Sequence, residues 1–151
     1  MRVYIAGPMT GIPQYNFPEF DRVATLLRAM GYDVVSPAEL DDPVDRAAAL
    51  QSIDGSVQTK SGFGKSWGDF LARDVKLIAD DGIEAIITLS GWEKSRGARL
   101  ETFVGYLCHL PILSMWHDHV VGTSLGYLLE VWGQHRLTDD LDAITSGVVH
   151  P

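Results

Sequence analysis

The sequence has almost no cysteine and no long apolar segment. Cys108 is the only cysteine among 151 residues, which excludes an internal disulfide and is typical of a reducing compartment; without a partner motif it is expected in the core. No apolar run approaches the roughly 20 residues of a membrane-spanning helix, and no basic region precedes an apolar core at the N-terminus. We therefore expect a cytoplasmic protein that has no membrane partner.

Positive charge is also scarce. Twelve Lys and Arg residues face 20 Asp and Glu residues, giving a net charge of −8, which argues against a nucleic-acid polymer as partner. A small nucleotide stays possible, because only its pocket needs local positive charge. A hydrophobic content of 46% with 21% charged residues is ordinary for one globular domain of this length.

Three familiar ligand motifs are missing or incomplete. The first predicted turn, residues 6–11, lacks the G-x-G-x-x-G pattern of dinucleotide-binding loops. Residues 64–66 spell Gly-Lys-Ser, but the glycine that a nucleoside-triphosphate loop needs five positions earlier is Thr59. The His-Asp-His run at 117–119, with Cys-His at 108–109, has no four-ligand spacing. We expect these histidines in a loop, and no metal or organic cofactor.

Strands alternate along the chain with helices of ten or more residues. This order predicts a parallel sheet with right-handed crossovers, so we expect an α/β fold: a flavodoxin- or Rossmann-like three-layer sandwich with a mainly parallel sheet of four or five strands. One domain should cover residues 1–151, with 136–151 as a polar tail. The predicted strands are 2–6, 32–36, 84–89 and 111–115, and the predicted helices are 17–30, 66–80 capped by Ser66 or Asp69, 98–109 and 120–135.

A long polar segment, residues 38–65, interrupts this alternation, with a short helix possible over 44–50. Loops of this length in compact domains are uncommon and are often functional lids. The apolar face between Leu125 and Trp132 has two interpretations. It covers the sheet, or it forms a contact between subunits.

The segment from Gly91 to Glu101 is the most informative part of the sequence. It follows an apolar strand and opens a helix near Ala98, which is where open α/β sheets bind ligands. Helix N-termini present free N–H groups to anions, and Ser95 lies at this point between cationic side chains. The pattern predicts a site for a small anionic substrate, although Arg96 and Arg99 at the rim also fit a solvated role.

Asp74 lies on the apolar side of the predicted helix 66–80, four residues from both Phe70 and Ile78. A carboxylate on a buried face is costly unless it is paired or used. Either Asp74 pairs with an arginine or caps a neighbouring loop, or it belongs to a functional site.

Glu101 is the second carboxylate of interest. It falls one turn into its predicted helix, where the helix dipole favours the ionised form, and its neighbours Ala98, Val104 and Gly105 are small and apolar. Spacing alone favours a solvated side chain. Because Asp74 and Glu101 flank the same strand, both can converge at one end of the sheet.

Three segments together resemble the nucleoside 2-deoxyribosyltransferase superfamily, including its nucleotide N-glycosidase branch and small phage and bacterial members. Residues 1–11 (MRVYIAGPMTG) resemble its first strand and base-binding loop, 72–78 (ARDVKLI) its helix with an active-site Asp, and 95–101 (SRGARLE) its loop and helix with the nucleophilic Glu. The resemblance covers residues 1 to about 115 in order and spacing.

The resemblance implies an enzyme that cleaves the N-glycosidic bond of a 2′-deoxynucleoside or its 5′-monophosphate. Glu101 would attack the sugar C1′ and Asp74 would manage protons or hold the sugar. Ser95 would bind phosphate, and Tyr15 or Tyr4 would supply the family's N-terminal tyrosine. The implied substrate-binding residues are Gly7, Pro8, Met9, Tyr15, Trp92, Ser95, Arg96 and Gly97.

The same resemblance implies a homodimer or higher homo-oligomer whose partner is a small nucleoside or nucleotide, with water or another base accepting the sugar. Two departures stand out. Glu84 occupies a position where the family often has Asp, and the family's C-terminal asparagine has no match after Met115. These departures keep an alternative open, a module that binds a nucleotide without turning it over.

Overall fold

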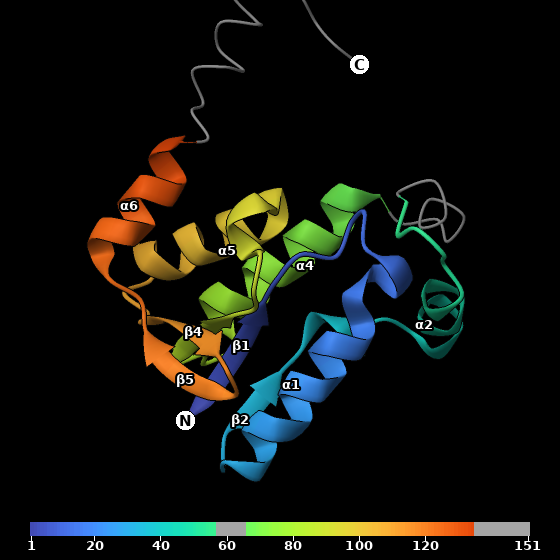
Figure 1. The fold of residues 1–151 in the computed structure, drawn as a ribbon, viewed down its shortest axis with the longest axis horizontal. Helices are drawn as coiled ribbons and strands as arrows, with labels where there is room; N and C mark the ends of the chain where they lie inside the picture. Colours follow the sequence, from blue (N-terminus) through green and yellow to red (C-terminus); the bar gives the residue numbers. More distant parts are fainter. Residues whose placement is uncertain (57–65, 135–151) are drawn as a thin grey trace, which may run out of the picture.

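Five strands form a single mixed sheet in the computed structural model, which describes residues 1–56 and 66–134. Its order is β2-β1-β3-β4-β5, with the first three pairings parallel and the last antiparallel (Figure 1). The α/β class and the mainly parallel sheet expected from the sequence are confirmed, and the arrangement is consistent with a Rossmann-like fold. The strands are β1 (Arg2–Ala6), β2 (Asp33–Val35), β3 (Ala85–Thr88), β4 (Ile112–Trp116) and β5 (His119–Gly122).

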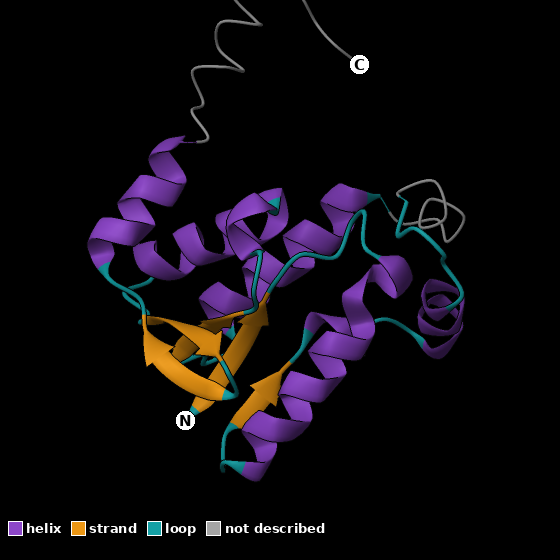
Figure 2. Ribbon diagram, viewed as in Figure 1, coloured by secondary structure: helices purple, strands orange, loops and turns teal. Residues whose placement is uncertain are grey.

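Helices connect the strands and cover the sheet (Figure 2). The described residues form α1 (Phe17–Ala29), α2 (Pro43–Leu50), α4 (Trp67–Asp80), α5 (Arg96–Leu107) and α6 (Leu125–Gln134), with short 3₁₀ turns η1 (Pro13–Asn16), η2 (Pro37–Glu39) and η4 (Trp92–Lys94). Within 1–56 and 66–134, none of these helices combines the length and apolar character that a membrane crossing needs. The expected C-terminal tail at 136–151 and the second part of the 38–65 segment lie outside the described residues.

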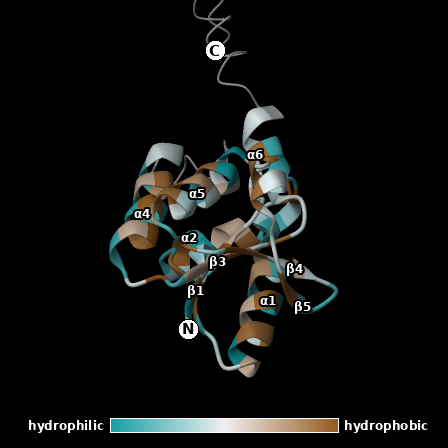
Figure 3. Cartoon of the chain, turned by 90° about the vertical axis from the view of Figure 1, so that its left-hand side faces the viewer, coloured by the Kyte–Doolittle hydropathy of each residue, from teal (hydrophilic) through white to brown (hydrophobic). Residues whose placement is uncertain are grey.

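Strand β1, which lies between β2 and β3 in the sheet, is buried on both faces. Val3 and Ile5 pack in one core cluster with α1, whereas Tyr4 and Ala6 pack in a second cluster with residues of α4, α5 and α6. This two-sided burial explains why the strand is a continuous apolar run, and Figure 3 colours the central strands as hydrophobic. It also directs the Tyr4 side chain toward α4 and α5.

The start of α4 is fixed by a capping box. The Ser66 hydroxyl accepts a hydrogen bond from the Asp69 N–H, and the Asp69 carboxylate accepts one from the Ser66 N–H. Each side chain thus satisfies a backbone N–H group near the helix start. Both residues named from the sequence therefore take part in the same cap.

The predicted helix over residues 120–135 is wrong in its first third. Strand β5 occupies 119–122, and α6 begins only at Leu125. His117 and Asp118 both have positive φ, 44° and 61°, and form a two-residue turn that pairs Trp116 with His119. Such turns usually contain Asn-Gly, so His-Asp gave no hairpin signal.

Two further side-chain expectations need correction. Cys108 is exposed at the C-terminal end of α5 rather than in the core. On α6 the predicted apolar face is divided, because Leu128 is buried in the second core cluster whereas Leu125 and Leu129 are 49% and 56% exposed. Covering the sheet therefore explains only part of this face.

Candidate functional site

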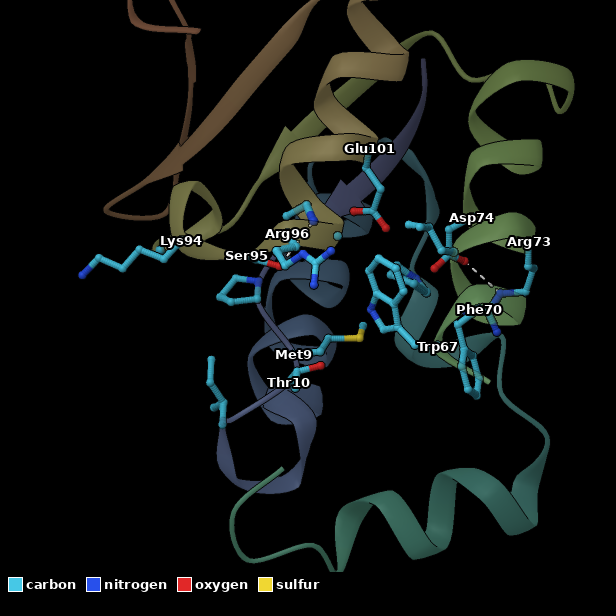
Figure 4. Close-up of a pocket in the computed structure, with 18 of the residues that line it drawn as sticks. Met9, Thr10, Trp67, Phe70, Arg73, Asp74, Lys94, Ser95, Arg96 and Glu101 are labelled. Atoms are coloured by element: carbon cyan, nitrogen blue, oxygen red, sulfur yellow. Dashed lines mark hydrogen bonds and ion pairs between the residues drawn. The ribbon is translucent and has the colours of Figure 1, made fainter. Parts of the chain in front are cut away.

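A cavity of about 810 Å³ opens where the strand order reverses. From β1 the chain passes to β2 on one side of the sheet, and β3 lies on the other side. Crevices at such points, beyond the carboxyl ends of the strands, are the usual ligand sites of open α/β sheets. The volume suits a small organic ligand. The wall is built from the loop after β1, the first turns of α4, and the segment from Ser90 to the second turn of α5 (Figure 4).

The two carboxylates singled out in the sequence both line this cavity. Asp74 on α4 is 7% exposed and Glu101 on α5 is 6% exposed, and Figure 4 shows them on facing helices with their carboxyl groups directed into the same space. For Glu101, the solvated alternative is therefore excluded. Two buried acids in one cavity are costly for folding, which marks the place as a candidate site.

The Tyr4 side chain extends from β1 of the sheet to Glu101 on α5. Its hydroxyl donates a hydrogen bond of 3.0 Å to Glu101 Oε1, and its side chain is completely buried. Tyr15 instead donates to the Ser56 carbonyl oxygen and packs in the core cluster on the other side of the sheet. Of the two tyrosines that the sequence left open, the structure places Tyr4 at the carboxylates and Tyr15 outside the cavity lining.

Burial raises the pKa of Glu101 to about 8, and the charge of Asp74 adds to this effect. The hydrogen bond from Tyr4 and the charge of Arg73 act in the opposite direction. The sequence led us to expect the helix dipole to favour ionisation. However, α5 begins at Arg96, so Glu101 lies in its second turn, and the dipole effect is confined to the first.

Arg73 forms an ion pair with Asp74, which was the structural alternative proposed for this acid. Arg73 Nε lies 2.8 Å from Asp74 Oδ1, and Arg73 Nη1 lies 2.9 Å from Asp41 Oδ1. Asp74 is thus paired and also lines the cavity. Neither Asp41 nor Arg73 was a candidate from the sequence. Asp41 contacts Arg73 without lining the cavity, and it belongs to a segment with no motif of its own.

The polar end of the cavity is formed by the start of α5, which carries polar and cationic side chains. Ser95 is the N-cap and accepts a hydrogen bond of 3.3 Å from the Ala98 N–H. The Arg96 guanidinium lies 5.4 Å from the centre of the Trp67 ring, and Gly97 and Lys94 also line the wall. In Figure 4 the Lys94 side chain extends away from the carboxylates.

Two other residues of this segment lie elsewhere. Arg99 is absent from the cavity lining and donates a hydrogen bond of 3.0 Å to the Glu93 carbonyl oxygen. Trp92, a predicted substrate-binding residue, is buried in the second core cluster and packs edge-on against Tyr127. Neither side chain reaches the cavity.

The loop after β1 does reach it, through Gly7, Pro8 and Met9. A Cβ atom at Gly7 would lie 2.8–3.0 Å from the side chain of Leu89, which is closer than real Cβ contacts. The glycine is therefore needed for the packing of two loops against each other. Trp67 and Phe70 complete the wall. In the sequence they were part of the apolar stripe of their helix, which did not distinguish core from cavity.

Among residues 1–56 and 66–134, no three His, Cys, Asp or Glu side chains gather in a way that could hold a metal ion. Comparisons with curated proteins and with solved structures gave no match. A family model, described as a domain of unknown function (DUF4406), matches residues 1–114. These residues contain the whole cavity lining and make up most of the chain, which therefore belongs to this family.

Proposed function

We propose that this protein cleaves the N-glycosidic bond of a 2′-deoxynucleoside 5′-monophosphate or 2′-deoxynucleoside, on a flavodoxin-like sandwich. The resemblance to the nucleoside 2-deoxyribosyltransferase superfamily supplies the reaction. Glu101 attacks the sugar C1′ as the base departs with its bonding electrons, and Asp74 holds the sugar or manages the proton that the base requires. Water or a second base then displaces Glu101 from the sugar.

The observation that carries this proposal is the pair of buried carboxylates, Asp74 and Glu101, in one cavity. Breaking a glycosidic bond develops positive charge on the sugar, and a carboxylate close to C1′ stabilises that charge or forms a covalent bond. A departing base also needs a proton, which in this proposal is managed by Asp74 and not by Glu101.

The protonation state of Glu101 sets a condition on this mechanism. With a pKa of about 8, Glu101 is largely protonated at neutral pH in the free protein, and it must lose its proton before it attacks. We therefore expect kcat/KM to rise with pH up to about 8, because this parameter reports the free enzyme. A profile that falls over the same range would assign Glu101 the role of a general acid instead.

The polar end of the cavity supports a 5′-monophosphate as the substrate. The Ser95 hydroxyl, the Arg96 guanidinium and the free N–H groups at the start of α5 suit an anion. The sugar would then lie between this end and the two carboxylates. The aromatic side chains of Trp67 and Phe70 offer apolar surfaces for the base.

Chromatographic detection of free base, released from a panel of deoxynucleosides and their 5′-monophosphates, tests the proposal. The wild type should release base from at least one monophosphate, and Glu101→Ala should lower the rate by several orders of magnitude. Ser95→Ala should weaken the preference for monophosphate over nucleoside. The ratio of the two substrates within one variant is the measurement, because it cancels the loss of the helix cap.

A nucleotide-binding module without turnover is the second candidate, and one observation favours it. A carboxyl group of pKa about 8 is a weak nucleophile at neutral pH. This module would bind deoxynucleotides in calorimetry, with Ser95→Ala weakening the binding, while no base appears at any pH up to 9. Base release that disappears in Glu101→Ala would exclude it.

A further inference from the structure

Arg73 joins two carboxylates from distant parts of the chain. Its Nη1 donates to Asp41 Oδ1 at 2.9 Å and its Nε donates to Asp74 Oδ1 at 2.8 Å. Asp41 lies between η2 and α2, in the segment that separates β2 from α4. Arg73 and Asp74 are consecutive on α4, and only Asp74 and Arg73 of these three line the cavity.

The burial of this group shows that it is more than a surface ion pair. The Asp41 side chain is 3% exposed and the Asp74 side chain 10% exposed, with Arg73 at 28% between them. A buried carboxylate is tolerated only with a well-placed partner. For comparison, the Lys76–Asp80 pair on the same helix has side chains that are 76% and 62% exposed.

The geometry fixes the direction of Arg73. A guanidinium is planar and its N–H groups are rigidly related, so anchoring Nη1 at Asp41 also sets where Nε points. The ring of Phe70, one turn earlier on α4, lies 5.5 Å from the guanidinium carbon and supports its flat face. Asp74 therefore receives its hydrogen bond from a donor whose orientation depends on Asp41, a residue outside the cavity lining.

We propose that Arg73 is a positioning residue for Asp74, and that Asp41 holds Arg73 in place and balances its charge. The proposal rests on the proposed function, since Asp74 is taken to act on the sugar or on the departing proton. It gives the segment between β2 and α4 a definite role in the chemistry of the site.

Charge balance matters because Arg73 also acts on Glu101. The charged and titratable groups that face Glu101 are Tyr4 from β1 and both Arg73 and Asp74 from α4; Asp74 raises the pKa of Glu101, and Arg73 lowers it. Asp41 offsets the guanidinium charge without entering the cavity. Removing the Asp41 charge leaves Arg73 less neutralised, so Glu101 should ionise at lower pH.

Three variants of the full chain separate charge from orientation. Asp41→Asn removes the charge but keeps an oxygen that accepts from Arg73. Arg73→Lys keeps the charge but loses the rigid pair of donors. Asp21→Asn is the matched control, because Asp21 pairs with Arg46 of α2 and so holds the same segment without contact to Arg73.

Titration of the Glu101 carboxyl carbon by ¹³C NMR in the ligand-free protein is the first measurement, with the signal assigned by its loss in Glu101→Gln. Asp41→Asn should lower the midpoint by about half a unit or more, while Arg73→Lys and Asp21→Asn leave it near the wild-type value. If the Glu101 midpoint in Asp41→Asn is the same as that in Asp21→Asn, the charge-balance role is overturned.

The rate of base release is the second measurement. Arg73→Lys should lower kcat about tenfold or more with little change in KM, whereas Asp21→Asn should change neither. Wild-type kcat in Arg73→Lys would overturn the positioning role, and this variant carries the test even where Asp41→Asn fails to fold. If the midpoint moves as expected but no substrate loses its base, the charge balance stands and the proposed function fails.

Discussion

The sequence identified Glu101 as a candidate residue, but it did not predict that the Glu101 side chain is buried. Its neighbours at three- and four-residue spacing, Ala98 and Gly105, are small and gave no sign of burial. The covering comes from Tyr4, 97 positions away in the sequence, and from α4. Helical spacing describes one helix face, so a contact of this range lies beyond what spacing can predict.

The raised pKa of Glu101 makes stability depend on pH. The ordinary pKa is 4.5 and the folded value is about 8, so the folded state binds this proton more tightly and loses stability as pH rises between these values. Glu101→Gln keeps the size and the acceptor for Tyr4 but does not titrate. We expect its gain over wild type to grow by about 3 kcal/mol between pH 5 and pH 8, measured by urea unfolding.

Glu19→Gln is the control for this experiment, because Glu19 is 40% exposed and pairs with Arg22 on the surface. Its difference from wild type should stay within about 1 kcal/mol at both pH values. An equal gain for Glu101→Gln at pH 5 and pH 8 would contradict the raised pKa.

Tyr4→Phe should raise the pKa of Glu101 further. The tyrosine hydroxyl donates to the carboxylate and favours its ionised form, whereas phenylalanine preserves the ring in the core. We expect an increase of about half a unit or more in the NMR midpoint. Tyr15→Phe is the matched control, since Tyr15 lies in the other core cluster, and an identical shift in both variants would refute a direct effect.

At the scale of single residues, the sequence predicted the carboxylates Asp74 and Glu101 and the lining residues around Ser95. It missed Arg73 and Asp41, and it placed Tyr15 and Trp92 among the substrate-binding residues although neither lines the cavity. An ion pair that spans two segments has no local pattern, because each partner alone is an ordinary charged residue.

At the scale of elements, α5 is held against the sheet at one close contact. A Cβ atom at Gly105 would lie 2.3 Å from Ile86 Cδ1 of β3, so Gly105→Ala has to displace either the Ile86 side chain or the helix that carries Glu101. We expect a loss of about 1–3 kcal/mol in the free energy of unfolding. Gly97→Ala on the same helix is the control: its nearest atom is 4.0 Å away, and it should be neutral or stabilising by up to about 1 kcal/mol.

The boundary of a helix or strand could be predicted where it is set by side chains that lie close to it in the sequence. The start of α4 followed from Ser66 and Asp69, whose side chains cap neighbouring N–H groups. The β4–β5 hairpin was not predictable in the same way. Its turn depends on His117 and Asp118 adopting positive φ, which is uncommon for any residue other than glycine, although Asp and His adopt it more often than most.

At the scale of the whole molecule, exposed apolar side chains remain on α5 and α6. Phe103 and Leu107 are 41% and 59% exposed, and Leu125 and Leu129 of α6 are also exposed. The homo-oligomer expected from the sequence stays a prediction. Light scattering across a range of concentrations should give a mass above that of one chain, and Leu129→Glu should lower it. A wild-type monomer at every concentration would contradict the expectation.

The pairing of β1 has a consequence for how the protein is made. β1 is synthesised before its neighbour β3, which begins at Ala85, opposite Val3, and contacts of such range form slowly. Until that pairing exists, Tyr4 is not held at Glu101, and the burial that raises the pKa of its carboxyl group is incomplete. An unfinished polypeptide on the ribosome therefore lacks the full pKa shift of this glutamate, and the unusual acid arises only after β1 and β3 have met.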